Sequence, residues 1–302
     1  MRLLKRTLTL AFAILPFLAM TQSLTDGIYM PKQNFCGGVM LMQDQFTNYW
    51  EGTTKRSNLN IGTMTMQSAT VMGIYGIMDH LNVIAAVPYI KTNATGGTLA
   101  GLSGIQDLTL GLKYKVIESG NWAANVVAGG SIPLTNYVAA YPLAIGNQSK
   151  TLFARGMIHF LNTQGWTAAV SGIYTLRSNI TIDATNYYTD KNVFSNQVAM
   201  SDVLQWNARA GHYSYRWGAE AMLDRSAVLG GFDIRRNDMM FPSNRQESTR
   251  IGFLGFYRFK ALNDLQVLGD VAYSLDGRNV GQALTLGVGF AMAFDWRKKE
   301  KK

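Results

Sequence analysis

Cysteine, histidine and charged residues are scarce in this sequence. Its 302 residues include one Cys, three His and only 16% charged residues. A single Cys excludes a disulfide scaffold and a thiolate zinc site, and the dispersed His80, His159 and His212 lack the spacing of metal ligands. No Gly-rich stretch is followed by Lys and Ser or Thr, so a phosphate-binding loop is missing as well. We therefore expect no metal site, no cofactor and no enzymatic activity.

Long apolar runs are also missing. Beyond residue 20, no run approaches the roughly 18 apolar residues of a membrane-spanning helix. The chain is nevertheless 47% hydrophobic and 11% aromatic, which argues against disorder. It is therefore either a protein with a large ordered core or a membrane protein that does not cross by helices.

A basic excess is present but lies mostly at the two ends of the chain. The formal net charge is +9, and much of it comes from the first six residues and from the basic tail at 297–302. Basic residues between the ends are scattered, and no RNA-binding or zinc-finger motif accompanies them. We therefore do not expect a nucleic-acid partner.

The N-terminus has the organisation of a secretory signal peptide. Basic residues precede an apolar run over 7–20, which small and polar residues then interrupt. Cleavage after Ala19 and after Ser23 both fit, and an uncleaved anchor stays an alternative. The expected division is a signal peptide (1–23), a β-barrel (24–296) and a basic C-terminal tail (297–302).

The body of the chain alternates with a period of two residues. Over 107–116 one face carries Leu, Tyr and Val, whereas the other carries Asp, Thr, Gly and Lys; 284–294 repeats the pattern. Such strands are about twice the usual globular length and fit tilted strands that cross a membrane. A soluble β-sandwich is the alternative, but long strands with charged inner faces favour the membrane barrel.

Counting these segments predicts an all-β fold: a transmembrane antiparallel up-and-down β-barrel of about 12 strands. The expected strands lie near 35–46, 63–76, 81–91, 105–117, 122–133, 150–161, 166–177, 202–213, 215–225, 249–260, 265–275 and 282–294. Short turns alternate with longer polar segments, as in barrels of the outer membrane of a diderm bacterium. An even strand count places both termini in the periplasm.

Trp122, Trp166 and Trp217 each follow a predicted short turn at an outward-facing position. They are predicted to form an aromatic girdle against outer-membrane lipid. In a soluble sandwich they would be ordinary core tryptophans.

Several short motifs carry a family resemblance. They are Tyr75–Val83, Val87–Tyr89, Gly104–Tyr114 and Ser131–Pro133. Together they resemble the MetA-pathway of phenol degradation family, most strongly over 63–135, with His80 and Gln106 as departures. The resemblance implies an outer-membrane β-barrel transporter that passes small, aromatic or hydrophobic molecules.

The inward faces supply candidate pore-lining residues. These are Asp107, Lys113, Lys115, Arg155, His159, Arg177, Arg209, Glu220, Asp224, Arg258 and Asp270. Charges inside a barrel must face water or pair with one another. A barrel of this size lies between small filled barrels and open porins, so we expect a narrow, partly occluded pore. The slight basic excess of the set would favour anionic solutes.

The predicted function is passive diffusion of small solutes through this pore. The mature N-terminus is too short for a plug domain, which disfavours energised uptake. The alternative is a structural or adhesive barrel with a filled lumen and partner-binding extracellular loops. Loops 178–200 and 226–248 fit either a lid or a variable surface. The aromatic residues near the C-terminus, Phe294 and Trp296, predict recognition by the barrel-assembly machinery.

Overall fold

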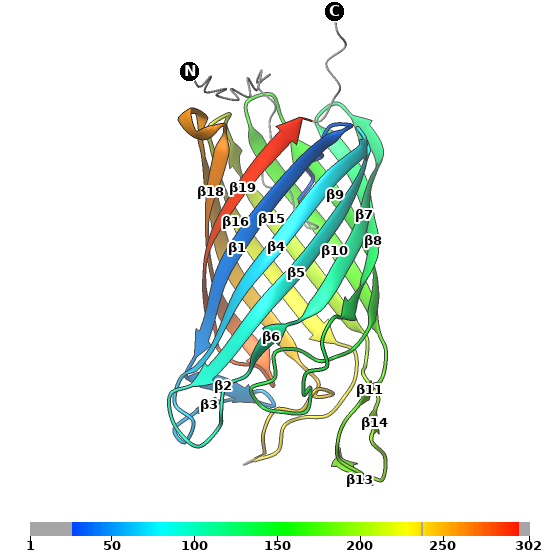
Figure 1. The fold of residues 1–302 in the computed structure, drawn as a ribbon, viewed down its shortest axis with the longest axis vertical. Coiled ribbons are helices and arrows are strands. Elements are labelled where there is room, and N and C mark those ends of the chain that lie inside the picture. Colours follow the sequence, from blue (N-terminus) through cyan, green and yellow to red (C-terminus); the bar gives the residue numbers. More distant parts are fainter. Residues whose placement is uncertain (1–25, 237, 296–302) are drawn as a thin grey trace, which may run out of the picture.

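The computed structural model describes residues 26–236 and 238–295. Within this part, long antiparallel strands form a single closed barrel (Figure 1). Its twelve long strands are β1 (Asn34–Phe46), β4 (Met64–Met78), β5 (Leu81–Ala94), β7 (Asp107–Ser119), β8 (Trp122–Pro133), β9 (Thr151–Leu161), β10 (Trp166–Arg177), β15 (Val203–Tyr213), β16 (Trp217–Val228), β17 (Glu247–Phe259), β18 (Leu265–Arg278) and β19 (Leu284–Asp295).

The remaining elements of the described chain are short. A 3-10 helix, η1 (Lys260–Leu262), lies in one turn, and β6 (Ser103–Ile105) extends the wall beside β5. The other short strands lie in loops: β2 (Asn48–Glu51), β3 (Thr54–Ser57), β11 (Ile180–Thr181), β12 (Tyr187–Tyr188), β13 (Asn192–Val193) and β14 (Gln197–Val198). None of the helices in the described residues has the length and apolar character needed to span a membrane.

Pairing of the first and last long strands closes the barrel. β1 pairs with β19 from Asn34↔Asp295 to Gln45↔Leu284, and on its other side β1 pairs with β4. Every long strand therefore has a partner on both sides, which removes the exposed edges of an open sheet. The predicted all-β fold with about 12 strands is confirmed.

The strand bounds agree with the predicted ones to within a few residues. The largest differences are at the ends of β5, β16 and β18, where the strands continue past the apolar part of the sequence. Hydrogen bonding to a neighbouring strand does not require apolar side chains, so the strands extend further than their apolar pattern. The predicted signal peptide and basic tail lie outside the described residues.

The two ends of the barrel differ. At one, which we call the turn end, the connections are short: 79–80, 120–121, 162–165, 214–216 and 260–264. At the other, the loop end, they are longer: 47–63, 95–106, 134–150, 178–202, 229–246 and 279–283. Figure 1 shows the turn end at the top and the loop end at the bottom. Left-handed residues such as Gly165 (φ 93°) and Asn263 (φ 55°) make the tight turns possible.

The wall is apolar outside and polar inside. On β7, Leu112 is 50% exposed on the outer face, whereas the next residue, Lys113, is 0% exposed inside the barrel. The same alternation runs along β9, where Leu152 and Ile158 are exposed and Arg155 and His159 are buried. In a soluble protein the apolar side chains would lie inside and the polar ones outside. The placement seen here is the reverse and matches a barrel surrounded by lipid.

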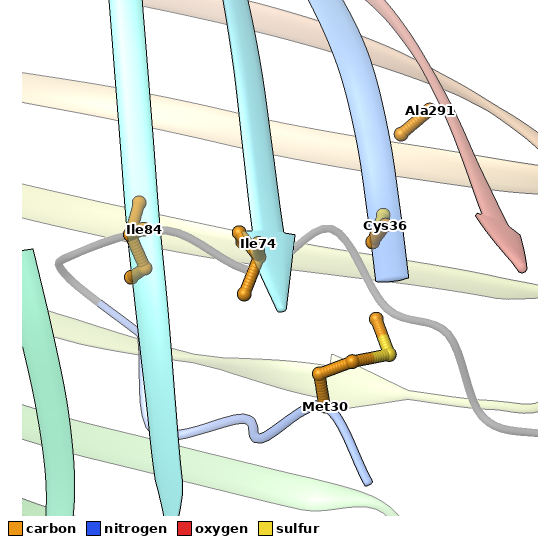
Figure 2. Packing of buried hydrophobic residues seen from close by; sticks show 5 residues of the cluster. All are labelled: Met30, Cys36, Ile74, Ile84 and Ala291. Carbon is orange, nitrogen blue, oxygen red and sulfur yellow. The ribbon is translucent and has the colours of Figure 1, made fainter. Parts of the chain in front are cut away.

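A segment before the first strand lies inside the barrel. Residues 26–33, which we call the lumenal strap, include the buried residues Asp26 and Met30, and the strap leaves the lumen at the exposed Lys32 and Gln33. Figure 2 shows the Met30 side chain beside Cys36, with Ile74 and Ile84 on the neighbouring strands. This short strap takes up part of the lumen.

Candidate functional site

The lumenal strap is anchored to the wall formed by β5 and β7. Lys113 donates from Nζ to Asp26 Oδ1 at 2.9 Å and to the carbonyl oxygen of Ile28 at 2.8 Å. Asn82 accepts from the main-chain N–H of Met30 at 2.8 Å and donates to its carbonyl at 2.9 Å. Charge-assisted and paired bonds of this kind hold the strap in one position.

The strap also reaches the opposite wall. Ile28 packs against the buried cluster of Tyr213, Phe256 and Leu268 from β15, β17 and β18. A Cβ atom at Gly27 would lie 2.2 Å from His159 Nδ1, so only glycine allows this close approach. The strap therefore crosses the lumen and narrows it toward the turn end.

All of the predicted lumenal residues are buried or half-buried in the structure. Four basic side chains gather on β7, β9 and β15: Lys113, Arg155, His159 and Arg209. Arg155 donates to Ser171 Oγ at 2.7 Å, and His159 Nε2 lies 2.9 Å from Thr167 Oγ1. We call this group the basic wall.

Three acidic residues lie on β16 and β18: Glu220, Asp224 and Asp270. Glu220 pairs with Arg209 at 3.2 Å and accepts a short hydrogen bond from the Tyr213 hydroxyl. Asp224 accepts from Asn207 Nδ2 at 2.6 Å. The basic residues thus lie on β7, β9 and β15 and the acidic ones on β16 and β18, and the two groups meet at the pair of Arg209 and Glu220, which composition alone did not indicate.

The other four predicted residues lie away from these groups. Lys115 pairs with Glu118 at 2.7 Å near the turn end, and Arg258 lies over the ring of Tyr215 at 5.2 Å. Arg177 donates from Nε to the carbonyl of Ser201 at 2.5 Å beside a long loop.

Asp107 accepts from the Tyr137 hydroxyl at 2.8 Å, also near the loop end. Burial and this bond raise the pKa of Tyr137, so its phenol keeps the proton that it donates. Asp107 therefore serves to hold loop 134–150 against the barrel. Whether the four outlying residues line a path for solutes stays a prediction.

A cavity of about 390 Å³ lies between the acidic residues and the strap; we call it the lumenal pocket. Its apolar lining includes Met40, Met42, Met72, Met222, Phe256 and Leu268. Its polar lining includes Asp26, Asn207, Arg209, Glu220, Asp224 and Asp270. A mostly apolar cavity with a few convergent polar groups is the usual form of a small-molecule site.

Two further cavities lie at the loop end, with volumes of about 300 and 390 Å³. Both are lined by Phe46, Met64, Pro142 and Met240, so they form one vestibule, whose rim also carries charged residues such as Glu51 and Arg56. Between this mouth vestibule and the lumenal pocket lies Arg250, 3.6 Å from Asp44. The Thr285 hydroxyl bridges Arg250 and Asp44, because it accepts a short hydrogen bond from Arg250 and donates one to Asp44. A solute would meet this polar cluster between the vestibule and the lumenal pocket.

Loop 226–248 borders the mouth vestibule, and loop 178–200 packs against loop 226–248. Tyr187 stacks on Phe241 with ring centroids 5.6 Å apart, and Met240 lines the vestibule. Arg278 binds Asp233 through two bonds of 2.7 and 2.6 Å, which lower the pKa of that carboxyl. Of the two interpretations of loop 226–248, the contacts favour a lid over a free surface loop.

The three predicted girdle tryptophans are the first residues of β8, β10 and β16 at the turn end. Trp122, Trp166 and Trp217 are 57%, 58% and 47% exposed on the outer face. The His212 ring lies between Trp166 and Trp217, and its Nε2 is 2.9 Å from the carbonyl oxygen of Gln164. The position suits an interfacial girdle, and contact with lipid stays a prediction.

Comparison with known proteins identifies the family. Residues 57–290 match the profile of the MetA-pathway of phenol degradation family. The chain belongs to this family. The match covers most of the described barrel, well beyond 63–135, where the sequence motifs are strongest.

Solved structures show what this family member resembles in fold. The COG4313 outer membrane channel from Pseudomonas putida F1 is 16% identical, with a TM-score of 0.73 over 90% of this chain and 100% of that chain. The translocator domain of the autotransporter NalP from Neisseria meningitidis is 11% identical, with a TM-score of 0.50 over 88% and 90%. No curated protein matches the sequence. At these identities the likeness establishes an outer-membrane β-barrel fold.

Sequence reasoning missed the strap and the methionine lining of the pocket. Met40 and Met42 occupy alternate positions on β1, so the period of two could have placed them on the inner face with Met72 and Met222. The strap gave no such signal, because 26–33 has no strand periodicity.

Proposed function

We propose that this chain is an outer-membrane channel through which small solutes, including aromatic and hydrophobic ones, diffuse passively. The observation that carries the proposal is the succession of the mouth vestibule and the lumenal pocket inside one closed barrel. A barrel whose role was only structural would have no need of cavities at its mouth and in its lumen. Membership of the family and a fold like that of an outer membrane channel support the same function.

The proposal includes an orientation. The loop end faces the outside of the cell, and the turn end, with both termini, faces the periplasm, as in other barrels of this kind. Outer-membrane lipid surrounds the apolar face, and the barrel-assembly machinery inserts the chain. A solute enters through the vestibule, passes Arg250 and Asp44, and reaches the pocket above the strap.

Conductance of the refolded protein in planar lipid bilayers tests this function. Discrete current steps, with an ion selectivity measurable from the reversal potential under a salt gradient, are expected. A sample that shows the heat-dependent gel shift of a folded barrel and yet carries no current would contradict an aqueous path. Uptake of a neutral aromatic solute into vesicles should accompany the current.

The structural or adhesive barrel is the second candidate, and the strap favours it. The buried pair of Lys113 and Asp26 fills the lumen near the turn end. If this barrel served adhesion, trimming loop 178–200 or loop 226–248 would abolish partner binding and leave permeability unchanged. A change in permeability after trimming loop 226–248 would support the channel, because Met240 of that loop lines the vestibule.

A further inference from the structure

The lumenal pocket has an apolar side built largely from methionine. Met40 and Met42 on β1, Met72 on β4 and Met222 on β16 all line it. Methionine is flexible and polarizable, and its sulfur makes favourable contacts with aromatic rings. The volume of about 390 Å³ lies within the usual range of small-molecule sites, roughly 300–1,000 Å³. This side suits an aromatic or alkyl body of modest size.

The polar side of the pocket carries an excess of negative charge. Asp26 and Glu220 are paired with Lys113 and Arg209, respectively. In the part of the chain that the structure describes, neither Asp224 nor Asp270 forms an ion pair. Arg250, the basic residue opposite Asp224 on β17, pairs with Asp44 instead. Arg155 lies near Asp224, and Arg250 and Arg209 lie near Asp270, but none of them is within ion-pair distance. Carboxylates that line a pocket without a cation bound to them favour a cationic ligand.

Three acceptor atoms of this side have no hydrogen-bond donor among the described residues, and one of them, Glu220 Oε2, faces the Arg209 guanidinium at 3.2 Å. Asn207 is only 7% exposed, and its Nδ2 donates to Asp224, which leaves its Oδ1 as an acceptor. Both this Oδ1 and Asp270 Oδ1 are buried without a hydrogen-bond partner. Buried acceptors without partners are costly, so a ligand that donates hydrogen bonds would stabilise the site. An ammonium group is positively charged, donates hydrogen bonds and accepts none.

We propose that the lumenal pocket binds an organic ammonium ion, a protonated amine with an aromatic or alkyl body. The nitrogen lies among Asp224, Asp270 and Asn207, and the body lies against the methionines. The inference rests on the proposed function, because the pocket is reached through the channel. It also reverses the anion preference expected from the basic excess: Lys113 and Arg155 do not line the pocket.

Three probes of nearly the same size test the proposal: benzylammonium, benzyl alcohol and benzoate. Their binding to the refolded full chain in detergent is measured by titration calorimetry at neutral pH. Benzylammonium should bind at least about tenfold more tightly than benzyl alcohol, because a charged hydrogen bond replaces a neutral one. Benzoate should bind most weakly. Equal affinity for all three probes, or a preference for benzoate, would overturn the proposal without any variant being needed.

Variants then locate the nitrogen. Asp270→Asn and Asp224→Asn keep the side-chain size and should each weaken benzylammonium binding about tenfold while benzyl alcohol is unaffected. Asp276→Asn is the matched control on the same strand; its exposed carboxylate pairs with Arg225 outside the pocket, so binding should not change. A gel shift on heating verifies that each variant is folded. Undiminished benzylammonium binding in both pocket variants would reject the assigned nitrogen site.

Current block separates this inference from the proposed function. If the protein conducts but benzylammonium neither binds nor blocks, the ammonium pocket is wrong and the channel stands. If the folded protein binds benzylammonium but neither ions nor solutes cross, the channel is wrong and the pocket stands. Binding together with a block that the Asp270→Asn variant relieves supports both.

Discussion

The two sides of the lumen differ in what fills them. On the basic wall, Lys113 and Arg155 are buried and hydrogen-bonded to the strap or to the next strand. On the opposite side, glycines alternate along β19, and Met40 lies over Gly287 and Gly289, so a cavity is left. Long basic side chains thus close one side of the barrel, and small residues beside methionine open the other. The width of the lumen therefore depends on the size of the inward-facing side chains as much as on the number of strands.

The largest expected effect comes from breaking the anchor of the basic wall. Lys113→Met leaves Asp26 buried without its cation, and breaking a buried pair in this way costs about 3–5 kcal/mol. Strand pairing does not depend on this contact, so the strap should leave the lumen while the barrel stays closed. Single-channel conductance should rise above that of the wild type.

Lys115→Met is the matched control for that experiment. Lys115 is the next inward residue of β7, but its carboxylate partner is the exposed Glu118, and its contact with the strap is a cation–π contact with Tyr29 at 5.2 Å in place of an ion pair. Exposed pairs contribute only about 0–1 kcal/mol, so conductance should stay near the wild-type value. Wild-type conductance in a folded Lys113→Met variant would show that the strap does not restrict the path.

The next largest effect comes from filling the open side. A Cβ atom at Gly289 would lie 2.7 Å from Met40 Sδ and 3.0 Å from Leu268 Cδ1. Gly289→Val should therefore push Met40 into the pocket, at a cost of about 1–3 kcal/mol for overpacking. Permeation of benzyl alcohol into vesicles should fall more steeply than the conductance of small ions.

Gly269→Val on the neighbouring strand is the control for Gly289→Val. Gly269 lies on the outer face, and a Cβ atom there would meet nothing within 4 Å. Its permeation and thermal stability should match the wild type. If both valine variants lowered benzyl alcohol permeation equally, the pocket would not lie on the solute path.

A smaller effect is expected at the loop end. Arg278 lowers the pKa of Asp233, so the stabilisation by this pair is present above the ordinary carboxyl pKa of about 4. It is lost as the pH falls through the lowered pKa. Loop 226–248 should therefore stay closed over the vestibule at neutral pH and loosen only in acid, below about pH 4.

A nitroxide label on a Cys introduced at Asp238 would report the mobility of this loop. The labelled protein without further substitution should show a mobile loop only in acid. Asp233→Asn should make the loop equally mobile at neutral pH. Asp190→Asn, in the other long loop, should leave the label unchanged. A label that is equally mobile at every pH would mean that the pair with Arg278 does not hold the loop.

The strands and the inward side chains could be predicted, but the arrangement of the lumen could not. Alternation along 107–116 fixes which face each residue occupies, because a strand has only two faces. The alternation does not reveal which side chains of other strands or of the strap a given inward residue contacts. Asp26 is 87 residues from Lys113 in the chain, and the two meet only because the strap lies inside the closed barrel. The preference for anions that the basic excess predicted has the same weakness, because composition does not show which charges pair with one another.

The smallest expected effect concerns the sulfur atoms of the open side. Met222→Leu nearly conserves side-chain volume, so the folded barrel should lose less than about 1.5 kcal/mol. It removes the thioether, whose contact with an aromatic ring contributes about 0.3–1.5 kcal/mol. Benzylammonium binding should therefore weaken about twofold to threefold, whereas butylammonium, which has no ring, should bind as before. An equal loss for both amines would show that Met222 acts through the shape of the pocket or through Arg209, whose guanidinium lies 3.2 Å from its sulfur.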